Sequence, residues 1–255
     1  MEAALIVVFG LIIGSFLNVV IHRLPLRQEI VFTPSHCPRC NAAIPFYLNV
    51  PLLSYAILLG RCRSCRAGIS PQYPLVEALT GLSFWLAFQR YGLSPHAAAC
   101  AVFLCLLIVL AAIDLKYMIL PDELTLGGAA VFLVYSFFNP EIGQLDAVLS
   151  GLGAALFFAA LFYAYLKLRK VEGLGFGDVK MALLLGLFLG VRRLVVAIFL
   201  ASLTGLLAGI FFILFKKKNL KFALPFGPFL ALGSYVALFC GDAVLAWIGA
   251  LWRLP

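Results

Sequence analysis

Long runs of apolar residues constrain this chain more than any other feature of its sequence. A helix needs about 20 apolar residues to cross a bilayer, and eight stretches are candidates: 1–21, 74–90, 97–115, 123–139, 147–166, 179–191, 194–215 and 226–252. Only 12% of the residues are charged, against roughly 25% in soluble domains. We therefore predict an all-α polytopic membrane protein with about eight transmembrane helices in the lipid bilayer. The short stretch at 179–191 and its neighbour could instead form a re-entrant pair, which leaves the count open by about one.

The basic residues predict how these helices are oriented. If the N-terminus is outside, fifteen of the nineteen lysines and arginines fall in inner loops: Arg23, Arg27, Arg39, Arg61, Arg63, Arg66, Lys116, Lys167, Arg169, Lys170, Lys180, Lys216, Lys217, Lys218 and Lys221. Only Arg90, Arg192, Arg193 and Arg253 then lie outside, as the positive-inside rule favours. This asymmetry accounts for the net charge of +8, so the charge does not indicate a nucleic-acid partner.

One extramembrane segment is large enough to form a small domain. We expect a first transmembrane helix at 1–21, a cytosolic loop domain at 22–73, and a membrane core of about seven helices at 74–255. The loop has roughly 50 residues, which is too few for a large hydrophobic core of its own. Another source of stability is therefore expected within it.

Two C-x2-C pairs in this loop indicate a metal site. Cys37 and Cys40 form one pair, and Cys62 and Cys65 form the other. Two such knuckles supply the four thiolates of a tetrahedral zinc ion, and four protein ligands leave no open position for catalysis. A structural zinc site is therefore favoured. Two disulfides or four free thiols remain alternatives, although a cytosolic location disfavours disulfides.

The few acidic residues near the membrane are candidates for chemistry. Asp114 ends the third predicted span, and Asp178 follows Gly175 and Gly177 at the start of the sixth. Taken singly, Asp114 could pair with a neighbouring lysine and Asp178 could cap its helix. Asp122 is predicted to be an N-cap or first-turn carboxylate. The outer acids are interpreted as solvated charges: Glu141, Asp146 and Asp242.

Asp114 and Asp178 together suggest more than either does alone. Both are predicted at the inner face of the membrane, on different helices. Two carboxylates that share a proton allow one to activate water while the other protonates the scissile amide. This is the chemistry of aspartic peptidases. The supporting glycines, Gly175 and Gly177, would let a substrate backbone approach closely.

The combined motifs resemble those of bacterial type IV prepilin leader peptidases, which are GxGD membrane aspartic peptidases. The resemblance rests on "GFGD" at 175–178, "IDLKYMILPD" at 113–122, the two C-x2-C pairs, and "GSFLNVVIHRLP" at 14–25. It runs over essentially the whole chain and implies that Asp114 and Asp178 are the catalytic pair. It also implies that type IV prepilins and pseudopilins, of pilus assembly or type II secretion, are cut at the cytosolic face of the bacterial inner membrane.

Bifunctional members of this family also methylate the new N-terminal amine, using S-adenosylmethionine. The cysteine-bearing loop is associated with that form, so the resemblance implies N-methyltransferase activity as well. The cofactor residues are unknown from the sequence. Glu77 is the one candidate, and an acid in the first turn of its helix, favourable to the helix dipole, is an equally good interpretation.

Two other functions stay open at this point. The chain could be a peptidase without methyltransferase activity, with a zinc loop that only shapes access to the site. It could also be a transporter or scaffold whose aspartates relay protons without cutting a substrate. Acids near the inner interface, and not at the midplane, favour the peptidase.

Overall fold

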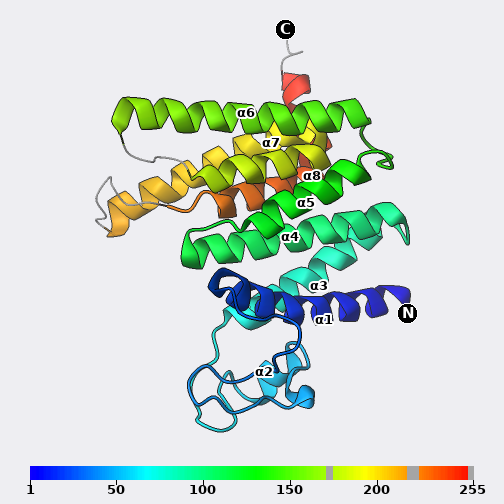
Figure 1. Cartoon of the computed structure of the whole chain (residues 1–255). Coiled ribbons are helices and arrows are strands. Elements are labelled where there is room, and N and C mark those ends of the chain that lie inside the picture. The colour runs from blue at the N-terminus through cyan, green and yellow to red at the C-terminus, as the bar shows by residue number, and fades with distance from the viewer. Residues whose placement is uncertain (171–174, 217–223, 252–255) are drawn as a thin grey trace. The chain divides into compact units, whose positions relative to one another are not determined.

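A computed structural model describes residues 1–170, 175–216 and 224–251 of the chain. Lys217, Lys218, Lys221 and Arg253, which are among the charges considered above, lie outside the described residues. The described part contains eight α-helices and no extended strand, only two isolated β-bridges, so the all-α prediction is confirmed (Figure 1). The chain divides into two compact units, Met1–Val109 and Leu110–Pro255.

In the first unit, α1 (Glu2–Arg23) packs closely against α3 (Gln72–Tyr91). Glycines at the interface make this possible. A Cβ on Gly10 would lie 2.9 Å from Cα of Gly81, and a Cβ on Gly14 would lie 2.7 Å from Cα of Glu77. Small residues spaced four apart let two membrane helices approach backbone to backbone. The first half of α4 (Pro95–Tyr117) completes this unit.

The segment between α1 and α3 contains little regular structure. It holds two short 3₁₀ helices, η1 (Leu24–Leu26) and η2 (Phe46–Leu48), and the five-residue helix α2 (Leu53–Ile57). Arg23 is buried and ties the segment to α1, because its guanidinium donates to the carbonyls of Glu29, Thr33 and Pro34. These charge-assisted bonds stabilise a loop that buries few apolar side chains of its own.

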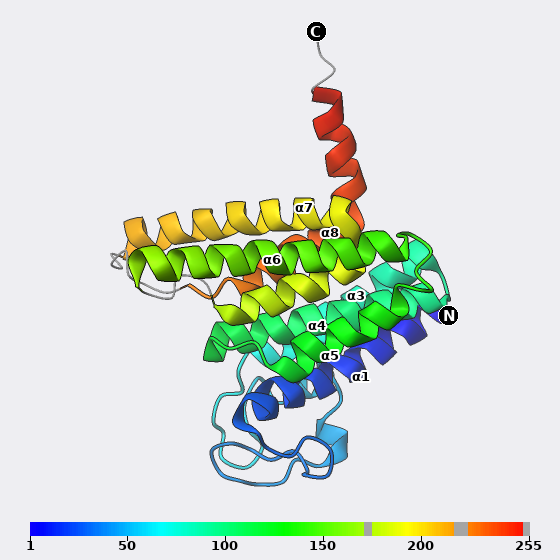
Figure 2. The same cartoon turned by 45° about the horizontal axis from the view of Figure 1, so that its top comes forward.

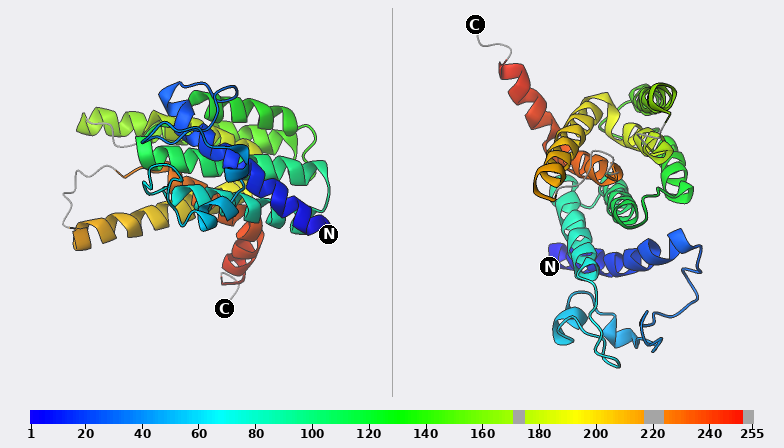
Figure 3. Two further views of the ribbon diagram at one scale, coloured as in Figure 1. Left: turned by 90° about the horizontal axis from the view of Figure 1, so that it is seen from below. Right: turned by 90° about the vertical axis from the view of Figure 1, so that its left-hand side faces the viewer.

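The second unit consists of the end of α4, α5 (Asp122–Tyr135), α6 (Gln144–Arg169), α7 (Phe176–Lys216) and α8 (Gly227–Leu251). The long helix α7 lies at its centre, with α5, α6 and α8 all packed against it. Figure 1 and the right-hand panel of Figure 3 both show α6 beside α7. The core of this unit therefore surrounds the helix that carries Asp178.

Helix α7 is not straight. Gly190 has φ 68° and ψ 169°, which breaks the helix, and Figure 2 shows α7 doubling back on itself. The Asp146 carboxylate accepts the N–H of Val191 at 3.3 Å and the hydroxyl of Ser150 at 3.0 Å. Asp146 therefore caps the second half of α7 and is not the solvated charge that the sequence suggested.

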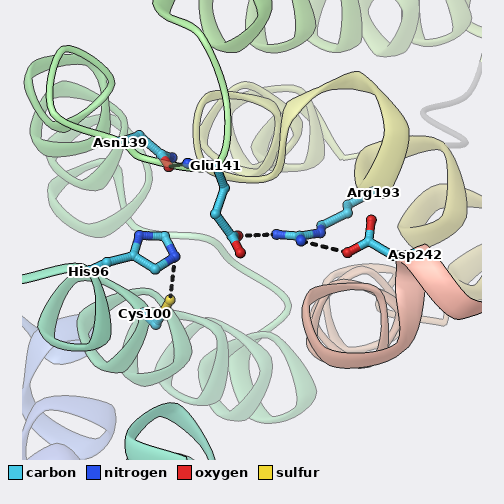
Figure 4. A network of polar contacts seen from close by, with 6 residues as sticks. All are labelled: His96, Cys100, Asn139, Glu141, Arg193 and Asp242. Atoms are coloured by element: carbon cyan, nitrogen blue, oxygen red, sulfur yellow. Dashed lines mark hydrogen bonds and ion pairs between the residues drawn. The ribbon is translucent and has the colours of Figure 1, made fainter. Parts of the chain in front are cut away.

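The two other outer acids are also paired. Arg193 forms ion pairs with Glu141, from the α5–α6 connection, and with Asp242 of α8, the latter at 2.7 Å (Figure 4). Glu141 and Asp242 are exposed, as the sequence suggested, but both also pair with Arg193. This pairing was not predicted because the arginine is about 50 residues away in sequence from each acid, and only the fold brings the three together.

Five helices in the described part of the chain are long and apolar enough to cross a membrane: Glu2–Leu26, Pro95–Tyr117, Gln144–Leu168, Phe176–Phe215 and Gly227–Trp247. A multi-pass membrane protein is thus confirmed. The sequence expected eight crossings because it divided 176–215 into two spans and added two shorter helices, α3 and α5.

Candidate active site and metal centre

The four loop cysteines converge on one point. Cys37, Cys40, Cys62 and Cys65 are free, and their Sγ atoms all lie within 4.8 Å of one another. The Sγ atoms of Cys37 and Cys65 are 3.9 Å apart, far beyond a disulfide bond of about 2.05 Å. A tetrahedron with Zn–S bonds of about 2.3 Å has edges of about 3.8 Å. The cluster therefore fits a tetrahedral metal ion.

The two knuckles share one backbone design. In each, the N–H of the first cysteine donates to the carbonyl five residues on, at Ala42 and Ala67. In each, the residue after the second cysteine has a left-handed backbone, with φ 58° at Asn41 and 60° at Arg66. This turn closes the knuckle and aims both sulfurs to the same side. The repeated geometry makes one site from two distant sequence segments.

The backbone of the first knuckle favours a thiolate at Cys37. Backbone N–H groups of Cys40 and Arg39 lower the pKa of Cys37 to about 6, against the opposing effect of burial. A backbone hydrogen bond from Ala42 favours the Cys40 thiolate too, but burial and the neighbouring sulfurs raise the pKa of Cys40 to about 11. The first knuckle therefore favours at Cys37 the thiolate form, which is the form that binds a metal ion.

Asp114 lies near the C-terminal end of α4 and is buried, with 6% of its surface exposed. The backbone N–H of Gly227 donates to its Oδ2 at 2.9 Å. Gly227 is the first residue of α8, and the next residue, Pro228, has no N–H to offer. Asp114 is therefore held by the one free amide at the start of another helix, where the helix dipole favours a carboxylate.

Asp178 lies in the first turn of α7 and is buried, with 5% of its surface exposed. Its Oδ2 accepts the N–H of Gly175 at 3.1 Å, while its own N–H donates to the carbonyl of Gly175 at 3.0 Å. This reciprocal pair is typical of an acid three residues into a helix. Asp178 thus closes the start of α7 without being the N-cap itself.

The fold brings the two aspartates together within the second unit. They come from separate helices, both are buried, and the charge on Asp114 acts on Asp178. Among the described residues, no lysine pairs with either carboxylate: the side chain of Asp114 accepts from Gly227 and that of Asp178 from Gly175. The arrangement keeps two interacting carboxyl groups out of bulk solvent. In such a pair, one group can act as the acid and the other as the base that activates a bound water molecule.

The turn between α4 and α5 links the two aspartates. A Cβ on Gly177 would lie 2.9 Å from Cβ of Leu120, so the first turn of α7 rests directly on this connection. Lys180 forms an ion pair with Asp122 at 2.5 Å. Asp122 is the first residue of α5, so its first-turn assignment is confirmed, and its partner lies only two residues beyond Asp178.

Glu77 does not lie in the first turn of α3, so that interpretation is wrong: α3 begins at Gln72, five residues earlier. Its carboxylate is buried and accepts the N–H of Leu52 at 2.9 Å, with Ser15 also bonded to it. Leu52 has φ 59°, so Glu77 fixes a strained point of the loop against α1 and α3.

Two residues near these sites were not predicted from the sequence. Gly227 holds Asp114, and Asn18 donates to the carbonyl of Tyr73, which joins α1 to the start of α3. The only sequence signals were a glycine between two prolines before the last span and a lone amide in an apolar helix. Neither pattern indicates which residue forms the hydrogen bond, because both partners are more than 50 residues away in sequence.

Comparisons with known proteins cover the chain almost from end to end. Residues 8–91 match the bacterial Peptidase A24 N-terminal domain, and residues 101–210 match the type IV leader peptidase family. Both Asp114 and Asp178 fall in the second match, and the four cysteines fall in the first. No solved structure matches the chain.

Full-length relatives carry the printed name prepilin leader peptidase/N-methyltransferase. One from Aeromonas hydrophila is 37% identical over 268 residues, which cover 96% of this chain and 92% of the relative. One from Burkholderia pseudomallei (strain 1026b) is 34% identical over 276 residues, with 98% and 89% covered, and one from Pseudomonas putida is 32% identical over 261 residues, with 94% and 91% covered. The chain therefore belongs to the bacterial type IV leader peptidase family, Peptidase A24.

Proposed function

We propose that this protein is a membrane aspartic peptidase that removes the short leader of type IV prepilins and pseudopilins and then N-methylates the new N-terminal residue. The observation that carries the proposal is the pair of buried carboxylates, Asp114 and Asp178, which come from different helices and interact through their charges. Membership in the peptidase family and the names of its relatives support the substrate and both activities.

In the proposed reaction, Asp114 and Asp178 share one proton, because two carboxylates whose charges repel each other do not both ionise readily. The ionised carboxylate takes a proton from a water molecule as that water attacks the scissile carbonyl carbon. The protonated carboxyl group first donates to the carbonyl oxygen. As the C–N bond breaks, a proton passes to the leaving amine, and the products are a carboxylic acid and a free N-terminus.

The helix start at Gly175–Asp178 would give the substrate access to this pair. Gly175 is exposed, and a side chain there would meet Oδ2 of Asp178 at 3.3 Å. Glycine keeps the approach to the carboxylate clear. Gly175 and Gly177 are thus proposed as supporting residues. Gly175 lets the substrate reach the carboxylate, and Gly177 lets the first turn of α7 pack against Leu120.

The proposed topology has eight crossings with the N-terminus outside. Gly190 divides α7 into two of them, and α3 and α5 supply the two shorter ones. The three proposed domains are 1–21, 22–73 and 74–255. Both Asp114 and the loop 22–73 then face the cytosol of a bacterial inner membrane, which is where the positive-inside rule puts the basic loops.

The loop is proposed to bind one structural zinc ion through Cys37, Cys40, Cys62 and Cys65. When bound, the ion would cross-link the two knuckles and so fold the loop. S-adenosylmethionine is proposed as the methyl donor, because the relatives are named N-methyltransferases. We propose that Glu77 contributes to the methylation step, because its carboxylate holds the loop segment at Leu52 in place.

The test is mass spectrometry of a type IV prepilin incubated with the purified protein, with and without S-adenosylmethionine. A leader-sized loss of mass, with a gain of one methyl group only when the donor is present, is the expected result. Leader loss without methylation would reduce the proposal to a peptidase. An intact prepilin, despite correctly folded protein, would refute it in favour of a transporter or scaffold.

A further inference from the structure

The loop between the two knuckles exposes an apolar helix face that no described residue covers. Leu53, Ala56 and Ile57 of α2 are all exposed, Leu53 at 55% and Ile57 at 67%. Positions i, i+3 and i+4 lie on one side of a helix. Leu59, just beyond α2, is 84% exposed. Contiguous exposed apolar side chains of this kind mark an interaction surface.

This helix begins beside the membrane-spanning part of the first unit. Leu52, immediately before α2, lines an open cavity of about 370 Å³ with Val7 and Leu11 of α1 and with Leu82 and Trp85 of α3. Trp85 lies thirteen residues into α3, which is about 20 Å along the helix. Figures 1 and 2 draw α2 alongside α1 and not beyond its end. Because α1 is long and apolar enough to cross a membrane, a bilayer around α1 would reach the apolar face of α2.

The knuckles add a surplus of positive charge. The loop 22–73 has six arginines and one acid, Glu29, which gives +5. A zinc tetrathiolate centre would contribute −2 and leave +3. Arg61, Arg63 and Arg66 follow α2 directly in the chain and are exposed. Basic residues next to an apolar helix are typical of segments that lie in a membrane interface and bind anionic headgroups.

We propose that the knuckle loop docks into the adjacent bilayer leaflet. The face of Leu53, Ala56 and Ile57 enters the acyl chains, and Arg61, Arg63 and Arg66 bind the phosphates of anionic phospholipids. This goes beyond the proposed function and does not depend on it; only the identity of the leaflet rests on the proposed orientation. The docked loop would hold the metal centre at the membrane surface.

A depth measurement by fluorescence tests this docking. The full chain is first freed of its own tryptophans by changing Trp85, Trp247 and Trp252 to Phe, and Ile57→Trp is then introduced as the single fluorescent probe. This protein is placed in nanodiscs of phosphatidylcholine and phosphatidylglycerol. Ser64→Trp, in the exposed tip of the second knuckle, is the matched control. We expect lipid brominated on its acyl chains to quench Ile57→Trp at least about twofold more than Ser64→Trp, and aqueous iodide to quench only the control.

The opposite pattern, with Ile57→Trp open to iodide and insensitive to brominated lipid, would overturn the docking. Retained metal content shows that each variant is folded, and Leu53→Trp, on the same face, replaces Ile57→Trp if that variant is not. The phosphate contacts are tested separately by omitting phosphatidylglycerol, which should weaken the lipid quenching of Ile57→Trp. Equal quenching with and without the anionic lipid would refute the arginine part of the proposal.

Discussion

Gly227→Ala should impair cleavage although Gly227 carries no functional side chain. A Cβ at this position would lie 2.7 Å from Oδ2 of Asp114, whereas ordinary contacts begin at 3.4 Å. The carboxylate must therefore retreat by about 0.7 Å, which breaks or stretches the 2.9 Å hydrogen bond from the Gly227 N–H. A hydrogen bond to a charged group contributes about 1.5–3 kcal/mol.

That loss corresponds to a decrease of roughly 10- to 150-fold in kcat, at about 1.4 kcal/mol for each factor of ten. The assay is the initial rate of prepilin cleavage at saturating substrate, with the thermal midpoint measured on the same samples. Gly209→Ala is the matched control: among the described residues, the same change meets only Leu224, at 3.8 Å, and should leave the rate within about twofold. A folded Gly227→Ala protein that cleaves as fast as the Gly209→Ala protein would refute the role given to this amide.

Three further predictions follow from other contacts. Lys180→Met should lower the cleavage rate by roughly 1.4- to 5-fold, because a partly exposed ion pair contributes about 0.2–1 kcal/mol. The exchange of both charges, Lys180→Asp with Asp122→Lys, should recover most of that rate in the same assay, and no recovery would argue against the ion pair. Cys37→Ser should lose the bound metal and lower the thermal midpoint, by metal analysis and calorimetry, whereas Cys105→Ser, outside the cluster, should retain the metal. Gly14→Leu should destabilise the protein by at least about 2 kcal/mol in chemical unfolding, because its side chain would overlap α3; unchanged stability would contradict the close α1–α3 packing.

Much of this architecture could be predicted because membrane helices are encoded locally. Apolar length alone predicts α1, α4, α6 and α8, and a two-residue spacing alone predicts the knuckles. The number of spans was harder to predict around Gly190, because a glycine within an apolar run does not indicate whether the helix continues with a bend or reverses its direction. The structure puts the break there, with Asp146 capping the second half.

The partners of individual polar groups were not predictable in the same way. Asp114 and Asp178 could be selected because carboxylates are costly near lipid. Gly227 could not, since its function depends on a backbone amide that only the packing of the second unit aligns with Asp114. Arg193 was also unpredictable as a partner of Glu141 and Asp242, because sequence patterns report neighbours along one helix and not across a bundle.

Asp114 and Asp178 are proposed to act together on the scissile bond. Cleavage of a purified prepilin by Asp178→Asn and by Asp114→Asn, each measured against the unmodified protein in the same lipid, tests this joint action most directly. We predict that each variant inserts and melts like the unmodified protein but yields no cleaved product, because asparagine can neither ionise nor carry the shared proton. A folded variant of either kind that still removes the leader would rule out the joint catalytic role of the two aspartates.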